Sequence, residues 1–206
     1  VGIRSALKEE DIKGCKYKFT YYDKIFHRAW VLNSAVRYIS TGDYLVMLDG
    51  DLIYNRHWLF EIFDTEQPAT AWGQLYYMSA RETDHYIKYK EIVERRGKIK
   101  LPAVMGAAGG ATVIPREIFF NVKGIPEMFK GTWGGNDNSF FCKLKALNYR
   151  MKEFKSKIFH LYHDQRTPIN NEIIENNKHV LKYNRSEWVK YIGEVGDNWG
   201  KLEEKE

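Results

Sequence analysis

Tyr44-Leu45-Val46-Met47-Leu48-Asp49-Gly50-Asp51 joins an apolar run of strand length to a pair of acidic residues. Five apolar side chains in succession, without polar alternation, are typical of a strand buried on both faces, as in a parallel sheet. Open α/β sheets bind their ligands at the carboxyl ends of such strands. The run therefore predicts an α/β protein with a ligand site at residues 49–51.

Helical and extended patterns alternate on both sides of this strand. Residues 26–39 carry apolar side chains at the three- and four-residue spacing of an amphipathic helix, which Gly42 ends. Further extended patterns lie at 1–4, 16–22, 69–78, 107–114 and 158–163. Further helical patterns lie at 82–96, from Pro115, at 136–147 and in the chain after Pro168. This alternation predicts helices packed on a mixed, mainly parallel sheet.

The length of 206 residues fits one large domain with an appendage. Hydrophobic residues make up 44% of the chain, which argues against disorder, and the absence of repeats and low-complexity linkers leaves no clean division. We expect a main domain at residues 1–165 and a charged, helical extension at residues 166–206.

The charge and the cysteines restrict the class of protein further. The net charge of +5 favours an anionic ligand or a membrane surface, but the basic residues are scattered among acids, as in no nucleic-acid-binding module. Cys15 and Cys142 are too far apart to indicate a disulfide framework or a zinc site. No apolar stretch has transmembrane length, and the first residues lack the pattern of a signal peptide. We expect a cytoplasmic protein that binds no nucleic acid and has peripheral contact with a membrane.

Asp49 and Asp51 are the first candidates for chemistry. In extended chain, side chains two residues apart lie on the same face, so both carboxylates could reach one divalent cation, and Gly50 allows a ligand to come close. Two other interpretations are a solvated turn and a phosphatase with Asp49 as nucleophile. Ile53 stands where that phosphatase motif has Thr or Val, so the motif is met only approximately.

Two later segments carry further candidates. Residues 131–138 read GTWGGNDN, in which Asp137 is either a cap or dipole partner of the following helix or a general base. His160 and His163 lie three apart near a strand end, where a single histidine is more often structural. Together with the acidic pair they indicate a metal site, in which one of them is expected as a ligand. Trp72, Tyr76 and Tyr77 are candidates for stacking on a sugar or for the core.

In this order the segments resemble inverting glycosyltransferases of the GT-A fold. The likeness rests on residues 25–33 (IFHRAWVLN), the D-x-D at 49–51, Gly109-Gly110, WGGND at 133–137 and a late histidine, and it covers residues 19–163. The β-1,4-galactosyltransferase type is closest, with family 2 enzymes and the polypeptide N-acetylgalactosaminyltransferases as relatives. The resemblance implies a GT-A (Rossmann-like) fold and a sugar-transfer reaction.

The resemblance also implies cofactor, substrates and site residues. Asp51, Asp49 and His160, with His163 as the alternative, match the ligands of Mn²⁺, for which Mg²⁺ could stand. A UDP-sugar is implied as donor and a glycan or glycoconjugate as acceptor. The residues that match the donor site are Asp49, Gly50, Arg4, Arg28 and Asn33. Asp137 matches the base that activates the acceptor hydroxyl. The residues that match the acceptor and donor loops are Trp133, Gly134, Gly135, Asn136, Gly109 and Gly110.

Two departures from the family pattern leave an alternative open. Asn136 stands where the family usually has Glu, and Asn138 replaces another acidic residue. Few residues precede Phe26, so the N-terminal nucleotide-binding part is expected to be shortened or incomplete. The alternative is a non-catalytic relative that binds a sugar nucleotide or glycan without turnover.

Overall fold

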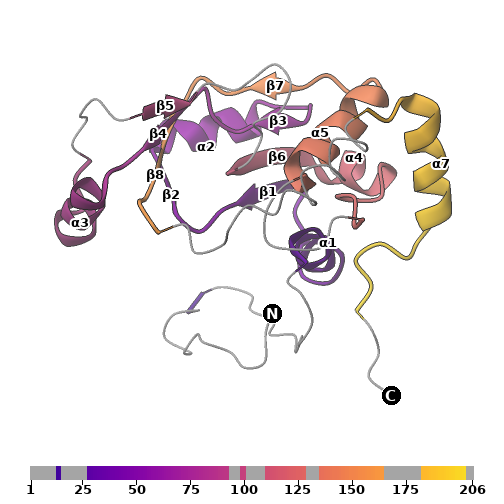
Figure 1. Cartoon of the computed structure of the whole chain (residues 1–206), viewed down its shortest axis with the longest axis horizontal. Helices are drawn as coiled ribbons and strands as arrows, with labels where there is room; N and C mark the ends of the chain where they lie inside the picture. Colours follow the sequence, from indigo (N-terminus) through magenta and orange to yellow (C-terminus); the bar gives the residue numbers. More distant parts are fainter. Residues whose placement is uncertain are drawn as a thin grey trace.

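The computed structural model describes residues 13–14, 27–92, 98–100, 110–128, 135–164 and 182–202. In this part of the chain the strands form two four-stranded sheets, with the orders β1-β6-β3-β7 and β2-β8-β4-β5 (Figure 1). The strands are β1 (Tyr44–Leu48), β2 (Leu52–Tyr54), β3 (Ala69–Thr70), β4 (Gln74–Tyr77), β5 (Lys98–Lys100), β6 (Ala111–Pro115), β7 (Lys152–Glu153) and β8 (Lys157–His160). The helices are α1 (Arg28–Tyr38), α2 (Arg56–Phe63), α3 (Ala80–Tyr89), α4 (Arg116–Asn121), α5 (Asn136–Ala146) and α7 (Arg185–Val195).

The α/β class and the mixed sheet are confirmed, whereas the expected strand directions are not. β1 runs antiparallel to β6 along its whole length, from Tyr44 opposite Pro115 to Leu48 opposite Ala111. Among the described strands only β3–β7 and β4–β8 are parallel pairs, so parallel pairing does not dominate. Only Leu45 of β1 is buried and Val46 is 38% exposed, so the expectation of a strand buried on both faces is wrong. The apolar run also carries no information on the direction of a neighbouring strand.

Most predicted elements occur near their expected positions. The helices at 26–39 and 136–147, the two strands within 69–78 and the helix after Pro115 are confirmed. The helix expected at 82–96 begins earlier, after the capping box of Ser79 and Glu82, and ends at Tyr89. The late strand ends at His160 instead of 163. The strands expected at 1–4 and 16–22 lie outside the described residues.

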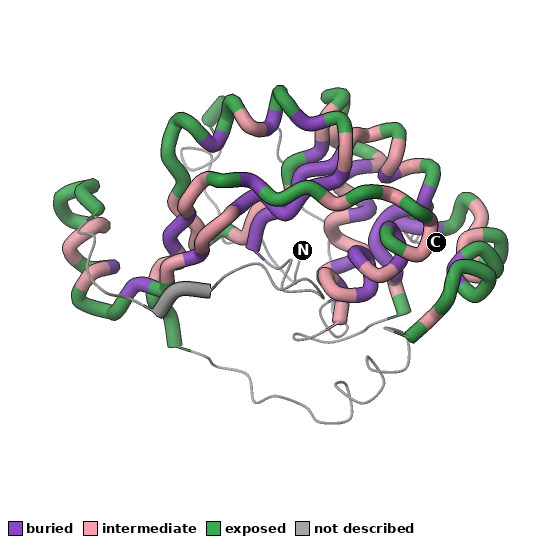
Figure 2. The backbone as a smooth tube through the Cα atoms, turned by 90° about the horizontal axis from the view of Figure 1, so that it is seen from above, coloured by how far each residue is buried: buried purple, intermediate pink, exposed green. Residues whose placement is uncertain are grey.

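Two hydrophobic clusters pack on the sheets. One joins α1 and β1 to α4 and α5, and the other packs α2 against β3, β4 and β6. α1 and α2 accordingly lie on opposite faces of the sheet β1-β6-β3-β7 (Figure 1). In Figure 2 the buried segments concentrate in the middle of the molecule, and α3 projects from it with mostly exposed residues. None of the described helices is both long and apolar enough to cross a membrane.

Trp199 is part of the first cluster although it lies far from the other members in sequence, and residues 199–201 pack on α1. The Trp199 ring is 3% exposed and packs edge-on against Phe119 and Phe120, at 5.8 and 5.1 Å between ring centroids. Arg37 of α1 donates a hydrogen bond of 2.7 Å to the Trp199 carbonyl and lies over its ring. The indole nitrogen of Trp30 donates to the Lys201 carbonyl at 2.8 Å. These residues therefore close one side of α1.

Gly200 makes a close approach to the backbone of α1. Its φ of +62° belongs to the left-handed region, and an added Cβ would lie 2.8 Å from the carbonyl carbon of Asn33. Its amide donates to the Glu127 carboxylate at 2.7 Å, and its carbonyl accepts from Ser34 of α1 at 2.9 Å. A side chain at position 200 would therefore force α1 and this segment apart.

Lys143 of α5 is fully buried in the same region. Its Nζ atom donates to the carbonyl oxygens of Val122, at 2.9 Å, and of Gly124. Burial lowers the pKa of Lys143 well below its usual value, and the charge of Glu127 opposes this shift only in part. The lysine holds α5 to the turn that follows α4.

The pH dependence of stability should reveal this lysine. In the unfolded chain the pKa of a lysine is about 10.4, so between the lowered folded value and about 10.4 the unfolded chain binds more protons. The free energy of unfolding therefore rises with pH in that window, by at most about 1.4 kcal/mol per pH unit, and Lys143→Met removes this rise. We expect the difference between wild type and variant in urea unfolding to grow in favour of wild type from pH 7 to 9.5. Parallel pH profiles would contradict the prediction. The window stays below the range of Tyr191, whose pKa burial raises to about 12.

Candidate active site

Three predicted residues meet where β1 ends. Arg28 begins α1, Asp49 follows β1, and Asp137 lies in the first turn of α5. The guanidinium of Arg28 donates to Asp49 Oδ1 at 2.7 Å and to Asp137 Oδ1 at 2.6 Å. Burial works to lower the pKa of Arg28, but the charges of Asp137 and Asp49 outweigh it, so this pKa is raised.

Asp137 is not used to cap its helix. The N-cap of α5 is Gly135, with a φ of +87°, and α5 has no capping hydrogen bond from a side chain there. The Asp137 side chain is 34% exposed and turns to Arg28 instead. Beside it, Asn136 is 7% exposed and its Oδ1 atom has no hydrogen-bond partner. The Asp137 side chain is therefore not a cap, and its place in the first turn of α5 suits the helix dipole.

A second group, which we call the metal cluster, consists of Asp51, His160 and His163. One potential ligand atom from each lies within 4.8 Å of the others. The Asp51 Oδ2 atom is 3.6 Å from His160 Nε2 and 3.2 Å from His163 Nε2. The other carboxylate oxygen, Asp51 Oδ1, is buried and has no hydrogen-bond partner among the residues that the structure describes. Sequence reasoning expected one histidine or the other, whereas the structure brings both to Asp51.

The hydrogen bonds of the histidines suit a cation. Nδ1 of His160 lies 2.7 Å from the Leu161 carbonyl, and Nδ1 of His163 lies 3.3 Å from the Asp164 carbonyl. A carbonyl only accepts, so each Nδ1 is the donor in these contacts and each Nε2 faces the carboxylate of Asp51. Two imidazole nitrogens and a carboxylate that converge in this way fit a divalent transition metal.

The sheet register explains this convergence. The turn at Gly50 leads into β2, where Leu52 pairs with His160 of β8, and the Leu161 amide donates to the Asp51 carbonyl at 2.8 Å. The same turn separates the two acidic side chains. Asp49 is held by Arg28 and is not brought into the metal cluster, contrary to the expectation from extended geometry.

The aromatic candidates divide between the core and the metal cluster. Trp72 is 0% exposed and belongs to the core, the second of its two alternatives, so a sugar cannot stack on it. Tyr76 stacks on Phe159 with its hydroxyl bonded to Gln74, at 2.9 Å. Tyr77 is 38% exposed, with its ring centroid 5.1 Å from that of His160. Burial, and then the charge of Asp51, raise the pKa of Tyr77.

The remaining predicted residues are placed as follows. Gly50 is exposed, and a Cβ there would meet nothing within 4 Å, so the backbone is open to a ligand. Gly110 is buried with a φ of +100°, and its carbonyl accepts from the Asp49 amide at 2.8 Å. Asn33 is fully buried and bonded to Ile125 and Glu127, so it has no surface for a ligand. Arg4, Gly109, Trp133 and Gly134 lie outside the described residues.

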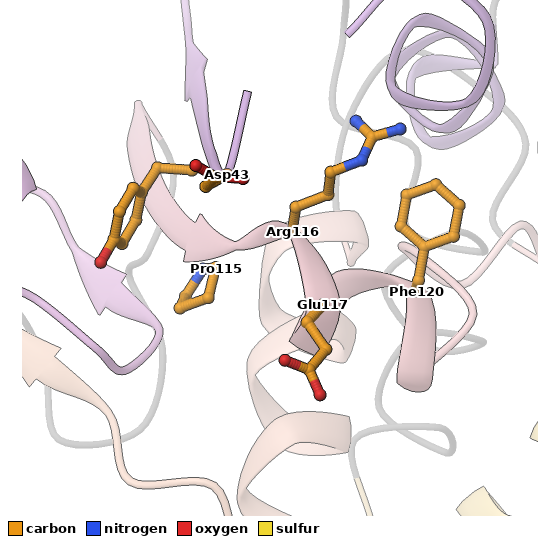
Figure 3. Close-up of a pocket in the computed structure, with 6 residues that line it drawn as sticks. Asp43, Pro115, Arg116, Glu117 and Phe120 are labelled. Carbon is orange, nitrogen blue, oxygen red and sulfur yellow. The ribbon is translucent and has the colours of Figure 1, made fainter. Parts of the chain in front are cut away.

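A cavity of about 490 Å³ lies at the opposite end of β1 (Figure 3). The residues that line it are Asp43, Tyr44, Pro115, Arg116, Glu117 and Phe120. Arg116 is already engaged, because it donates to the Ser40 carbonyl at 2.8 Å and lies over the Phe120 ring. The cavity includes no predicted site residue and is separate from the metal cluster.

Sequence reasoning missed two features of the site. The pairing of Arg28 with Asp137 joins residues 109 apart, and no local pattern indicates it. The joint use of both histidines follows from the pairing of β2 with β8, although their three-residue spacing was a usable signal.

Comparison with known families gives one match, to the N-terminal domain of galactosyltransferase, over residues 96–164. That segment includes Asp137, His160 and His163, and it spans about a third of the chain. Comparison with curated proteins gives no match.

Solved structures give more extensive matches. The catalytic domain of Drosophila β1,4-galactosyltransferase 7 in complex with xylobiose is 20% identical, with a TM-score of 0.50, over 79% of this chain and 64% of that chain. A variant of that enzyme with manganese, UDP-Gal and xylobiose is 18% identical, with a TM-score of 0.50, over 84% and 68%. GalNAc-T7 with UDP, GalNAc and Mn²⁺ is 14% identical, with a TM-score of 0.53, over 90% and 41%. The chain thus spans less than two thirds of the first of these chains.

Proposed function

From the GT-A fold that this chain shares with those glycosyltransferases, we propose that it transfers a sugar from a UDP-sugar to a hydroxyl group of a glycan or glycoconjugate. The reaction depends on a metal and inverts the configuration at the anomeric carbon. The observation that carries the proposal is the convergence of Asp51, His160 and His163 at the end of β1. The transfer machinery is assigned to residues 1–165, and residues 166–206 are assigned to a helical extension whose residues 199–201 pack back on α1.

Asp51, His160 and His163 are the residues that would hold Mn²⁺. Their chemistry supports this, because a carboxylate oxygen and two imidazole nitrogens converge and the second oxygen of Asp51 has no other partner within the described part of the chain. When bound, the cation neutralises charge on the diphosphate leaving group. Structural relatives of the chain were determined with manganese or Mn²⁺ bound.

Asp137 acts as the general base. The acceptor hydroxyl attacks the anomeric carbon, the bond from that carbon to the diphosphate oxygen breaks, and the hydroxyl proton passes to the Asp137 carboxylate. A single displacement of this kind inverts the anomeric carbon. Two observations support this role. The Asp137 side chain is partly exposed, and Arg28 connects it to Asp49, which the resemblance assigns to the donor. Gly50 leaves room for the donor next to the cluster.

Titration of UDP into the protein, with and without Mn²⁺, tests the donor site. We expect binding that requires Mn²⁺ and that Asp51→Asn weakens at least tenfold, because a neutral amide is a poorer ligand for a hard cation. Asp43→Asn, at the far end of β1, is the matched control and should bind like wild type. Failure of UDP to bind wild type in the presence of Mn²⁺ would remove the basis of the proposal.

A second candidate is a non-catalytic relative that binds the donor without turnover. Asn136 favours it, because the side chain next to Asp137 lacks the charge that the family usually has there. Metal-dependent binding of UDP without transfer from any of a panel of UDP-sugars would support this candidate over the enzyme.

A further inference from the structure

The guanidinium of Arg28 connects two carboxylates that come from distant parts of the chain. Its Nη1 atom donates to Asp137 and its Nη2 atom to Asp49, at 2.6 and 2.7 Å. Asp49 precedes the metal cluster residue Asp51 by two positions. Asp137 lies in the first turn of α5. The Arg28 side chain therefore holds Asp49, the residue assigned to the donor, in a fixed position relative to Asp137, the proposed base.

These ion pairs are partly shielded from water. The side chains of Arg28, Asp49 and Asp137 are 25%, 37% and 34% exposed. Without the guanidinium, two carboxylates would share this region with no cation between them, and their repulsion would drive them apart. The arrangement of Asp137 thus depends on Arg28.

The atoms used by Arg28 leave the base free to react. Arg28 binds Asp137 through Oδ1, so Oδ2 is the oxygen left to accept a proton from an acceptor hydroxyl. The planar fork of an arginine holds two carboxylates at a fixed separation, whereas lysine offers a single point charge on a flexible stem. The geometry therefore requires arginine and not only a positive charge.

We propose that Arg28 is a positioning residue, which fixes the carboxylate of Asp137 relative to Asp49 and so aligns the base with the bound donor. The inference rests on the proposed function, since it concerns the same transfer. It goes beyond donor binding, the role that the resemblance implies for Arg28. A residue that only binds donor affects the donor KM, whereas a residue that orients the base affects kcat at saturating donor.

The test uses Arg28→Lys and Arg28→Ala in the full chain. UDP with Mn²⁺ is the binding probe, and turnover is measured with UDP-galactose and xylobiose, and then with a panel of UDP-sugars and glycans. We expect Arg28→Lys to lower kcat about 100-fold at saturating substrates, the loss typical of a misplaced reacting group, while the Kd of UDP changes less than about threefold. Arg37→Lys on the same helix is the matched control and should retain kcat, although it loses a hydrogen bond to Trp199.

Two further measurements separate positioning from a structural role. Guanidinium ion added to Arg28→Ala should restore at least a tenth of wild-type kcat, which a general loss of structure would not allow. In the Asp137→Asn background Arg28→Lys should cause no additional loss, because both changes act on the same carboxylate. Thermal melts of all variants exclude unfolding as the cause of lost turnover.

The outcomes distinguish the inference from the proposed function. A wild-type kcat in Arg28→Lys, a loss confined to donor affinity, or additive losses in the double variant would overturn the role of Arg28 and leave the transferase intact. A wild type that turns over no UDP-sugar of the panel would overturn the proposed function and the inference with it.

Discussion

Asp137→Asn is expected to lower kcat for sugar transfer by about 1,000-fold and to leave Mn²⁺-dependent binding of UDP at the wild-type level. General-base catalysis contributes about 10²–10⁴-fold, and an amide cannot accept the proton of an attacking hydroxyl. Asp137 is not in the metal cluster, so the metal and the nucleotide should bind as before. The isosteric amide also keeps one oxygen for the hydrogen bond from Arg28.

Steady-state kinetics with the donor and acceptor on which wild type is active, combined with titration of UDP, measure both effects. Asp64→Asn at the end of α2 is the control, because its carboxylate is exposed and outside the active site. A kcat above a tenth of wild type in Asp137→Asn would show that another group takes the proton.

Trp199→Ala is expected to lower the free energy of unfolding by about 3–5 kcal/mol, the usual cost of truncating a buried large aromatic residue. The ring is 3% exposed and packs against Phe119 and Phe120. Its loss would leave a cavity between α1 and α4 and would remove the surface on which Arg37 lies.

Urea unfolding measures this change, with Phe63→Ala as the matched control. Phe63 is also a large aromatic residue of the described chain, but it is 76% exposed, so its truncation should cost less than about 0.5 kcal/mol. Trp199→Phe should lie between the two variants. A loss below about 1 kcal/mol for Trp199→Ala would mean that residues 199–201 contribute little to the core.

Local patterns predicted much of the fold. The apolar spacing over residues 26–39 located α1, the run at 44–48 located β1, and Pro115 marked the start of α4. Pairing between strands lies outside such patterns, because the antiparallel register of β1 with β6 joins residues more than sixty positions apart. The burial of Trp199 was equally hidden, since a single aromatic residue among polar neighbours has no periodicity to interpret.

The candidate site, like the fold, was predicted from local patterns only in part. Asp51, His160 and Asp137 were found from short motifs, because acidic pairs and paired histidines carry their chemistry in their residue types. Which of them meet depends on tertiary structure. The register of β2 with β8 brings both histidines to Asp51, and the turn at Gly50 sends Asp49 to Arg28 instead. Asn33, which the resemblance assigned to the donor, supports the turn at Ile125.

The contact between α1 and residues 199–201 determines when, during its synthesis, the chain can complete its fold. Trp30 and Lys201 are 171 positions apart, so at roughly 5–20 residues per second a ribosome needs about 9–34 s to supply the partner of the helix. During that time the side of α1 that contacts residues 199–201 remains uncovered, and Ser34 lacks its hydrogen bond to the Gly200 carbonyl. Folding of this part of the chain should therefore be completed only after Trp199 has been synthesised, and a nascent chain stalled before Trp199 should be sensitive to protease and should recruit chaperones.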